Sequence, residues 1–558
     1  KPVQTDLVQA GGGSLSATAT GDVNLGETVD DFLAGTISTS TGVIRVTSSA
    51  GIVNGGSGVV NFNAPDIRLV AANLGTAINR LVYEQPKTIG TAVTSFTTTT
   101  TGDQYLKFVS STANRVSGIP VNNAYLTNLV STQGVIDLDS EAPIQVVSVS
   151  STAAGVKLKS AYSINDANSS PAPDIIGFTG IDLESVNGTI GESGAGLEVV
   201  QGPTGSLKAR AAGTVWLVQT ANDMRVDSVI SIAGTARLYS YGSIIDAFSD
   251  PGTDVTGVSI DLNSTAGGIG DSSKELDTDN GSGRFTATAA GAIRLRETAG
   301  DMRVGRVQAG QEVKLSAAQG SILDGSNDAF VKISGTDITL VSDKAAIGSA
   351  SDELEIDTQG TGRLTASAAT DAYITEKIGA LKVTSVGAGA NLRLSVAESS
   401  GQGDDIILDS GSTVSGGKDV SLLAGDNITV TAGAAVTAGT VLNLTGDKPS
   451  LDPEGSIITI AGDLNASTVS ITAAAGQGAK LVSSIDGNQE LSNSQLKRTP
   501  ASSTTVQTIA IIGFTQASLA GGASDNTMSI GGWTGSVTVD GGSGYDTITV
   551  TTDTDFNI

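Results

Sequence analysis

The chain has 558 residues, a formal net charge of −26, and neither cysteine nor histidine. The missing side chains exclude disulfides, thiolate or imidazole metal sites and catalysis by cysteine or histidine, so zinc enzymes and Ser-His-Asp hydrolases drop out. The acidic surface repels nucleic acid and attracts divalent cations, and no apolar stretch approaches the ~20 residues that span a bilayer.

The rest of the composition favours a long repeat protein built from strands. Glycine occurs 71 times, aromatic residues make up only 4% of the chain, and the hydrophobic fraction of 39% is enough for a folded core. Short runs of β-branched residues alternate with glycine, asparagine and aspartate turns. We therefore predict an all-β fold, an elongated parallel β-helix or solenoid with coils of about 20 residues.

The first two segments differ in texture. Residues 1–62 read as N-terminal β-helical coils, with strands and glycine turns but no clear repeat. Residues 63–128 lose this regularity, and we expect an irregular insertion or a lateral lobe there.

Residues 129–416 contain a repeat of about 80 residues. Taking Ile144, Met224, Met302 and Leu381 as equivalent gives spacings of 224 − 144 = 80, 302 − 224 = 78 and 381 − 302 = 79. Such a small drift indicates a real repeat, in which one unit holds about four coils. The two methionines are expected to fill the core, and Arg225, Arg303 and Lys382, which alternate with these core positions, are expected to face solvent.

One aspartate recurs with the repeat, at Asp166, Asp246, Asp324 and Asp409. These residues would form a ladder of cation sites along one edge, or they recur simply because an Asx turn recurs. The turn is the favoured reading, since aspartate side chains commonly accept hydrogen bonds from main-chain groups two residues on.

Residues 417–482 form a short-coil β-helix, and residues 483–558 a C-terminal β segment. The last segment contains Gly541-Gly-Ser-Gly-Tyr-Asp-Thr-Ile-Thr549, which fits the nonapeptide G-G-x-G-x-D-x-U-x. Asp546 is a candidate calcium ligand, with Asp540, Gly541, Gly542 and Gly544 completing an oxygen shell. The alternative is a tight turn that needs no metal.

A shortened copy of this motif begins 541 − 521 = 20 residues upstream and offers Asp525 as a weaker ligand. Asp553 and Asp555 could supply a following turn, although no second intact nonapeptide appears. Calcium is the only cofactor that the residues suggest.

Other candidate residues have simpler explanations. Trp216 and Trp533 could stack against sugars, but isolated aromatic residues in such a fold more often pack in the core or cap a coil. Asp404-Asp405 is a carboxylate pair of the kind that glycosidases use, yet the surrounding Gly-Gln-Gly-Asp-Asp reads as a turn.

The stretch SLLAGDNITVTAGAAVTAGTVLNLTGD resembles the β-helical shafts of filamentous-haemagglutinin-like bacterial adhesins, and GGSGYDTIT resembles the RTX-type nonapeptide of large exported proteins. The resemblance implies a protein that is extracellular or located at the bacterial cell surface. Its expected partners are the cell surface, matrix polysaccharide or other copies of itself.

Three functions follow from these observations. The first is a non-catalytic structural or adhesive shaft segment of a large secreted or cell-surface protein. The second is a self-assembling extracellular filament or surface-layer subunit, joined through open β edges. The third is a β-helical polysaccharide lyase or hydrolase, which regular repetition disfavours because an active site needs an irregular coil.

Overall fold

The computed structural model describes residues 3–4, 13–56, 58–84, 94–110, 115–116, 119–120, 125–168, 170–191, 194–448, 455–474 and 478–551. It contains two compact units, Lys1–Gly283 with Thr288–Gly291, and Arg284–Ala287 with Ala292–Ile558. No helix occurs among the described residues. Accordingly, no described helix offers the length and hydrophobicity of a membrane span.

In the first unit, the strands divide between two sheets. The first sheet contains β1 (Val3–Gln4), β3 (Val23–Glu27), β5 (Val43–Ser48), β8 (Asp66–Ala71), β11 (Thr94–Thr100), β15 (Tyr125–Ser131), β17 (Ile144–Ser151), β19 (Ile164–Asp166), β20 (Ile175–Gly177), β22 (Leu197–Gln201), β24 (Val215–Gln219), β26 (Thr235–Ser240) and β29 (Ser259–Ser264). The second contains β2 (Leu15–Ala19), β4 (Phe32–Thr39), β6 (Gly51–Asn54), β7 (Phe62–Asn63), β9 (Asn73–Leu74), β10 (Leu81–Glu84), β12 (Gln104–Val109), β16 (Ile136–Ser140), β18 (Val156–Ser160), β21 (Gly180–Ser185), β23 (Ser206–Ala211), β25 (Met224–Ser231), β27 (Ile244–Asp246), β28 (Val255–Thr256) and β30 (Leu276–Asp279).

The second unit has the same two-sheet arrangement. Its first sheet contains β33 (Met302–Ala309), β35 (Ile322–Asp324), β36 (Ile333–Ser334), β38 (Leu354–Asp357), β40 (Ala372–Glu376), β42 (Leu392–Val396), β44 (Val420–Leu423), β47 (Val441–Gly446), β50 (Thr468–Ala473), β52 (Gly487–Ser492), β53 (Gln495–Pro500), β54 (Gln507–Ile512), β56 (Thr527–Gly531) and β58 (Thr547–Thr551). Its second contains β32 (Ile293–Glu297), β34 (Val313–Ala317), β37 (Ile338–Ser342), β39 (Arg363–Ala368), β41 (Leu381–Ala388), β43 (Ile406–Gly416), β45 (Ile428–Val430), β46 (Ala435–Ala438), β48 (Ile457–Ile460), β49 (Asp463–Asn465), β51 (Lys480–Ser484), β55 (Gln516–Ala520) and β57 (Ser536–Asp540). Strand β31 (Phe285–Ala289) has residues in both units.

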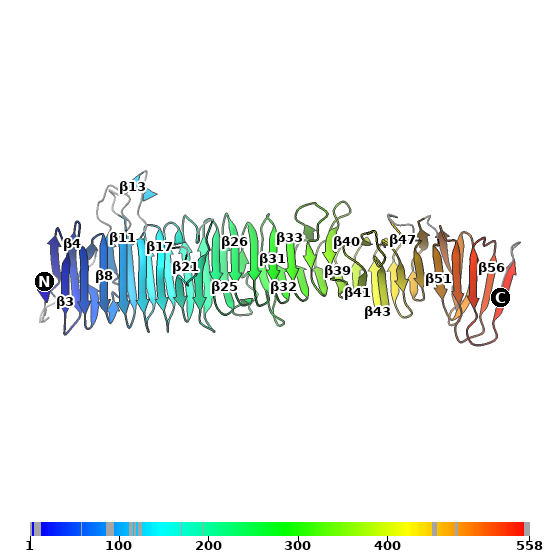
Figure 1. Cartoon of the computed structure of the whole chain (residues 1–558), viewed down its shortest axis with the longest axis horizontal. Helices are drawn as coiled ribbons and strands as arrows, with labels where there is room; N and C mark the ends of the chain where they lie inside the picture. The colour runs from blue at the N-terminus through cyan, green and yellow to red at the C-terminus, as the bar shows by residue number, and fades with distance from the viewer. Residues whose placement is uncertain are drawn as a thin grey trace. The chain divides into compact units, whose positions relative to one another are not determined.

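Each strand pairs in parallel with the equivalent strand one coil away (Figure 1). In β24, β26 and β29, for example, Val215 pairs with Ala236 and Ala236 with Ile260, which are steps of 236 − 215 = 21 and 260 − 236 = 24 residues. The chain makes about 22 turns of about 23 residues. The predicted all-β parallel solenoid is thus confirmed, with coils slightly longer than the sequence suggested.

The 80-residue repeat is visible in the strands. Ile144, Met224, Met302 and Leu381 each begin a strand of 8 residues, β17, β25, β33 and β41. All four side chains are fully buried, which confirms the core role of the methionines. In each strand two adjacent residues in the middle face outward, so the inward face is resumed one residue out of step.

Serine residues at the ends of inward faces explain how a serine-rich chain forms a core. Ser151, Ser231 and Ser342 are buried, and each hydroxyl donates a hydrogen bond to a glycine carbonyl of the preceding turn at 2.7, 2.8 and 2.9 Å. Because the buried hydroxyl and the buried carbonyl satisfy each other, the small polar residue closes the coil without a desolvation cost.

Residues 63–128 contribute strands to the parallel ladder. Strand β11 pairs with β8 and β15, and β12 pairs with β10 and β16. The core beside them is aromatic, since Tyr83, Phe96 and Phe108 pack with ring centroids 4.9 to 5.4 Å apart. A short antiparallel pair, β13 (Arg115–Val116) and β14 (Ile119–Pro120), leaves the ladder here.

Candidate cation-binding sites

The C-terminal turns stack as the nonapeptide spacing predicts. The turn of Gly541–Asp546 joins β57 to β58, and Gly521–Asn526 joins β55 to β56 one coil earlier. The motif glycines Gly542 and Gly544 adopt φ angles of 90° and 118°, which favour glycine.

Carboxylates in these turns bind main-chain amides. Asp546 Oδ1 accepts a hydrogen bond from the Asn526 N–H at 2.9 Å, and Asp525 Oδ1 accepts one from the Tyr545 N–H at 2.7 Å. Asp540 Oδ1 accepts one from the Gly542 N–H at 3.0 Å. Three carboxylates do not converge among the residues described in these turns. Calcium binding at Asp546 therefore stays a prediction, and Asp553 and Asp555 lie outside the described residues.

The recurrent aspartates do form Asx turns. Asp166, Asp246 and Asp324 each use Oδ1 to accept the main-chain N–H two residues on, at 2.7 to 2.8 Å. Asp409 instead forms an ion pair with Arg363. In the first three residues, however, the turn occupies only one carboxylate oxygen, and Oδ2 is buried without a hydrogen-bond donor among the described residues.

Each of these three aspartates belongs to a cluster that the sequence reading missed. The second member follows eight residues later and the third lies at the start of the strand one coil on. We call them the first cluster (Asp166, Asp174, Glu198), the second cluster (Asp246, Asp254, Asp277) and the third cluster (Asp324, Lys332, Glu355). In every cluster the N–H of the second member donates to the carbonyl oxygen of the third at 2.9 Å, so the three positions are structurally equivalent.

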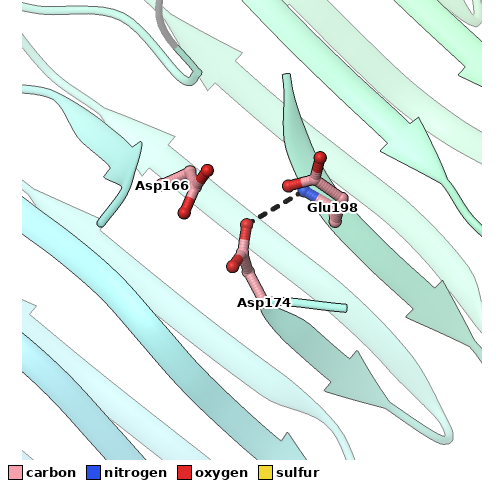
Figure 2. A group of neighbouring side chains, drawn as sticks. All are labelled: Asp166, Asp174 and Glu198. Carbon is pink, nitrogen blue, oxygen red and sulfur yellow. Dashed lines mark hydrogen bonds between the residues drawn. The ribbon is translucent and has the colours of Figure 1, made fainter. Parts of the chain in front are cut away.

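The first cluster contains carboxylates only (Figure 2). One oxygen from each of its three side chains lies within 4.8 Å of the other two. Asp174 Oδ2 accepts the Glu198 N–H at 3.2 Å, whereas Asp166 Oδ2 and Glu198 Oε2 are buried without a donor among the described residues. Burial raises the pKa of Asp174 to about 8, and the neighbouring Glu198 and Asp166 act in the same direction.

The second cluster holds an ammonium group. Lys274 Nζ lies 2.9 Å from Asp277 Oδ2 and 3.9 Å from Asp246 Oδ2. Although burial opposes the charged lysine, its hydrogen bond with Asp277 raises the pKa of Lys274 above the ordinary value. Burial raises the pKa of Asp254 to about 8.

In the third cluster the ammonium group comes from the second member itself. Lys332 is 1% exposed, and its Nζ lies 3.3 Å from Asp324 Oδ2 and also pairs with Asp328. Asp352 and Glu355 complete the acidic surroundings. Burial raises the pKa of Glu355 to about 7.

The remaining candidates serve as structural groups. Trp216 lies on the outer face, where the Arg237 guanidinium covers its ring at 5.3 Å, and Trp533 is buried with its indole N–H donating to the Ser536 carbonyl at 3.2 Å. Asp404 accepts the Ser399 N–H at 2.7 Å, and Asp405 the Asn427 N–H at 3.0 Å. These aspartates therefore act as acceptors in stacked turns.

A shallow groove runs over the outer face of β12, β16, β18, β21 and β23 in the first unit. It has a volume of about 320 Å³, and its lining includes Tyr105, Asp137, Lys157, Asp182 and Lys208. These five residues are successive partners in the parallel register. The groove therefore presents alternating charges beside one aromatic ring.

Comparison with family models, curated proteins and solved structures finds no match for this chain. The clusters could have been found from the repeat alone, because the spacings 166 to 174, 246 to 254 and 324 to 332 are all eight residues. What the repeat could not show is that a residue from the next coil closes each cluster.

Proposed function

We propose that the chain is a structural and adhesive shaft segment of a large secreted or cell-surface bacterial protein, with no catalytic role. The observation that carries this proposal is the coil-on-coil repetition, in which the same 8-residue strand and the same cluster return about every 79 residues. Each coil contacts its neighbours through parallel main-chain pairing, so length can be added without a new core.

The groove supports the adhesive part of the proposal. Charged residues that alternate at the ~4.8 Å spacing of stacked strands, next to Tyr105, offer a repeated set of hydrogen-bonding groups to an extended polymer. Polysaccharide is the partner whose hydroxyl groups suit both signs of charge and whose rings suit an aromatic surface.

Sedimentation with insoluble matrix polysaccharides and with whole bacterial cells tests adhesion. We expect the intact chain to co-sediment and the Lys157→Glu/Lys208→Glu variant to bind at least tenfold more weakly. Lys418→Glu is the matched control, because Lys418 is exposed outside the groove. Equal binding by all three proteins, or binding by none, would contradict the adhesive role, and release of reducing or unsaturated ends would point to an enzyme.

Self-assembly is the second candidate. Strand β58 pairs with β56 only, among the strands that the structure describes, and most of its residues are exposed. An open strand edge can accept a strand from another copy. Electron microscopy decides between the two, since ordered filaments or lattices favour assembly and separate particles favour a shaft.

A further inference from the structure

The first cluster differs from the other two at one further position of the repeat. Ala195, Lys274 and Asp352 all lie five residues after an isoleucine, Ile190, Ile269 or Ile347, that forms an equivalent parallel bridge. The second cluster therefore takes its ammonium group from a position where the first unit of the repeat has alanine.

No charged group replaces this lysine in the first cluster. Among the described residues, no lysine or arginine forms an ion pair with Asp166, Asp174 or Glu198. Asp174 is 1% exposed and Asp166 is 8% exposed. Asp166 directs an unpartnered oxygen at the place where its equivalents, Asp246 and Asp324, face a lysine Nζ at 3.9 and 3.3 Å.

We propose that Asp166, Asp174 and Glu198 bind one Ca²⁺ ion, which takes the place of the lysine ammonium group of the second and third clusters. This inference does not depend on the proposed shaft function, and the site is separate from the nonapeptide turns.

The donor set suits this ion. Oxygens bound to one Ca²⁺ at 2.3–2.6 Å can be no more than about 5 Å apart, and the three carboxylate oxygens lie within 4.8 Å of one another. Only oxygen ligands are present, which favours a hard cation, and water can complete the 6–8 ligands of Ca²⁺. Mg²⁺ fits less well because it requires a near-ideal octahedron.

A fourth equivalent position shows how the chain manages without a cation. Asn54 and Asn61 occupy the positions of Asp166 and Asp174, since Ile37 N–H bonds to the Asn61 carbonyl at 2.8 Å just as Val149 N–H bonds to that of Asp174 at 2.6 Å. Asn61 Nδ2 donates to Asn54 Oδ1 at 3.1 Å. Two neutral amides satisfy each other there, whereas two aspartates need a positive charge or a proton.

The test is hydrogen exchange of the full chain, first stripped with a chelator and then given Ca²⁺. We expect amides in residues 164–201 to exchange about 100-fold more slowly at a Ca²⁺ concentration 100 times the dissociation constant. Ala195→Lys should abolish this response, because it supplies the ammonium group that the second cluster already has. Residues 541–546 are read separately, which distinguishes this site from the nonapeptide.

Two further variants keep the proposal falsifiable. Lys274→Ala should create a second calcium response, in residues 244–279, because it leaves Asp246, Asp254 and Asp277 without their ammonium group. Asp166→Asn/Asp174→Asn copies the neutral pair and should fold without a calcium response at 164–201, which decides the question if Ala195→Lys does not fold. Absence of a response in the wild type, or an unchanged one in either of the variants altered at the first cluster, would overturn the site.

Discussion

The second and third clusters hold an ammonium group between the same carboxylates but obtain it from different places in the chain. In the second cluster Asp254 lies on the inner strand position and Lys274 reaches in from the loop, whereas in the third cluster Lys332 takes the inner position and Asp352 the loop position. The two residues have exchanged charge. The repeat thus constrains the combination of charges in the cluster more tightly than the residue at either position.

The two arrangements differ in burial. The Lys274 side chain is 21% exposed, while that of Lys332 is 1% exposed. A charge held in water-free surroundings depends more on its partners, and its removal leaves carboxylates that water cannot reach. Loss of the two lysines should therefore have unequal effects.

Lys332→Met should have the largest effect of the changes considered. It leaves Asp324 and Glu355 buried without their cation, which costs about 3–5 kcal/mol. Local opening of residues 322–334 should become roughly 10²–10³-fold more frequent, measured by hydrogen exchange because long repeat arrays do not unfold in one step. Lys274→Met in the absence of calcium is the matched variant, with an expected cost of about 1–2 kcal/mol.

The exchange of charge gives this prediction its control. Lys332→Asp/Asp352→Lys rebuilds in the third cluster the arrangement of the second, so it should recover most of the stability that Lys332→Asp alone removes. Equal losses for the two lysine variants, or no recovery in the double variant, would show that the clusters are not equivalent.

The solenoid could be predicted from sequence because its signals are periodic. Met224 and Met302 mark the inward face, and Gly-Asp turns mark the ends of coils, so local pattern and fold agree. The clusters were missed because Asp166 was read with its own turn alone. Its partner Glu198 is 32 residues away, and only the stacking of coils brings the two together.

A second comparison concerns buried acids with neutral partners. Glu376 is fully buried and accepts hydrogen bonds from the N–H and hydroxyl of Thr358, and Gln219 ends the equivalent strand β24 of the first unit of the repeat. Burial raises the pKa of Glu376 to about 8. Above its unfolded pKa of ~4.3, therefore, the folded state holds a proton that the unfolded state releases, and stability falls as pH rises toward 8.

Glu376→Gln should remove this part of the pH dependence. Between pH 6.0 and 7.5 one raised carboxyl group changes stability by about 2 kcal/mol, and the variant should lose that much less than the wild type over this range. Protection of residues 372–376 against hydrogen exchange at both pH values measures the difference. Parallel changes in wild type and variant would mean that Glu376 is ionised in the folded protein.

The smallest effect is expected at the C-terminal turns, where carboxylates are more exposed than in the clusters and already bind amides. Asp546→Asn keeps an oxygen acceptor for the Asn526 N–H, so it should cost only about 0.5–1 kcal/mol without calcium. A calcium ion at this turn would have to compete with the amide bonds of Asp525 and Asp546, whereas in the first cluster it would meet unpartnered oxygens. We therefore expect calcium to slow exchange less at residues 541–551 than at residues 164–201. The opposite order, abolished by Asp546→Asn, would make the nonapeptide the main calcium site of the chain.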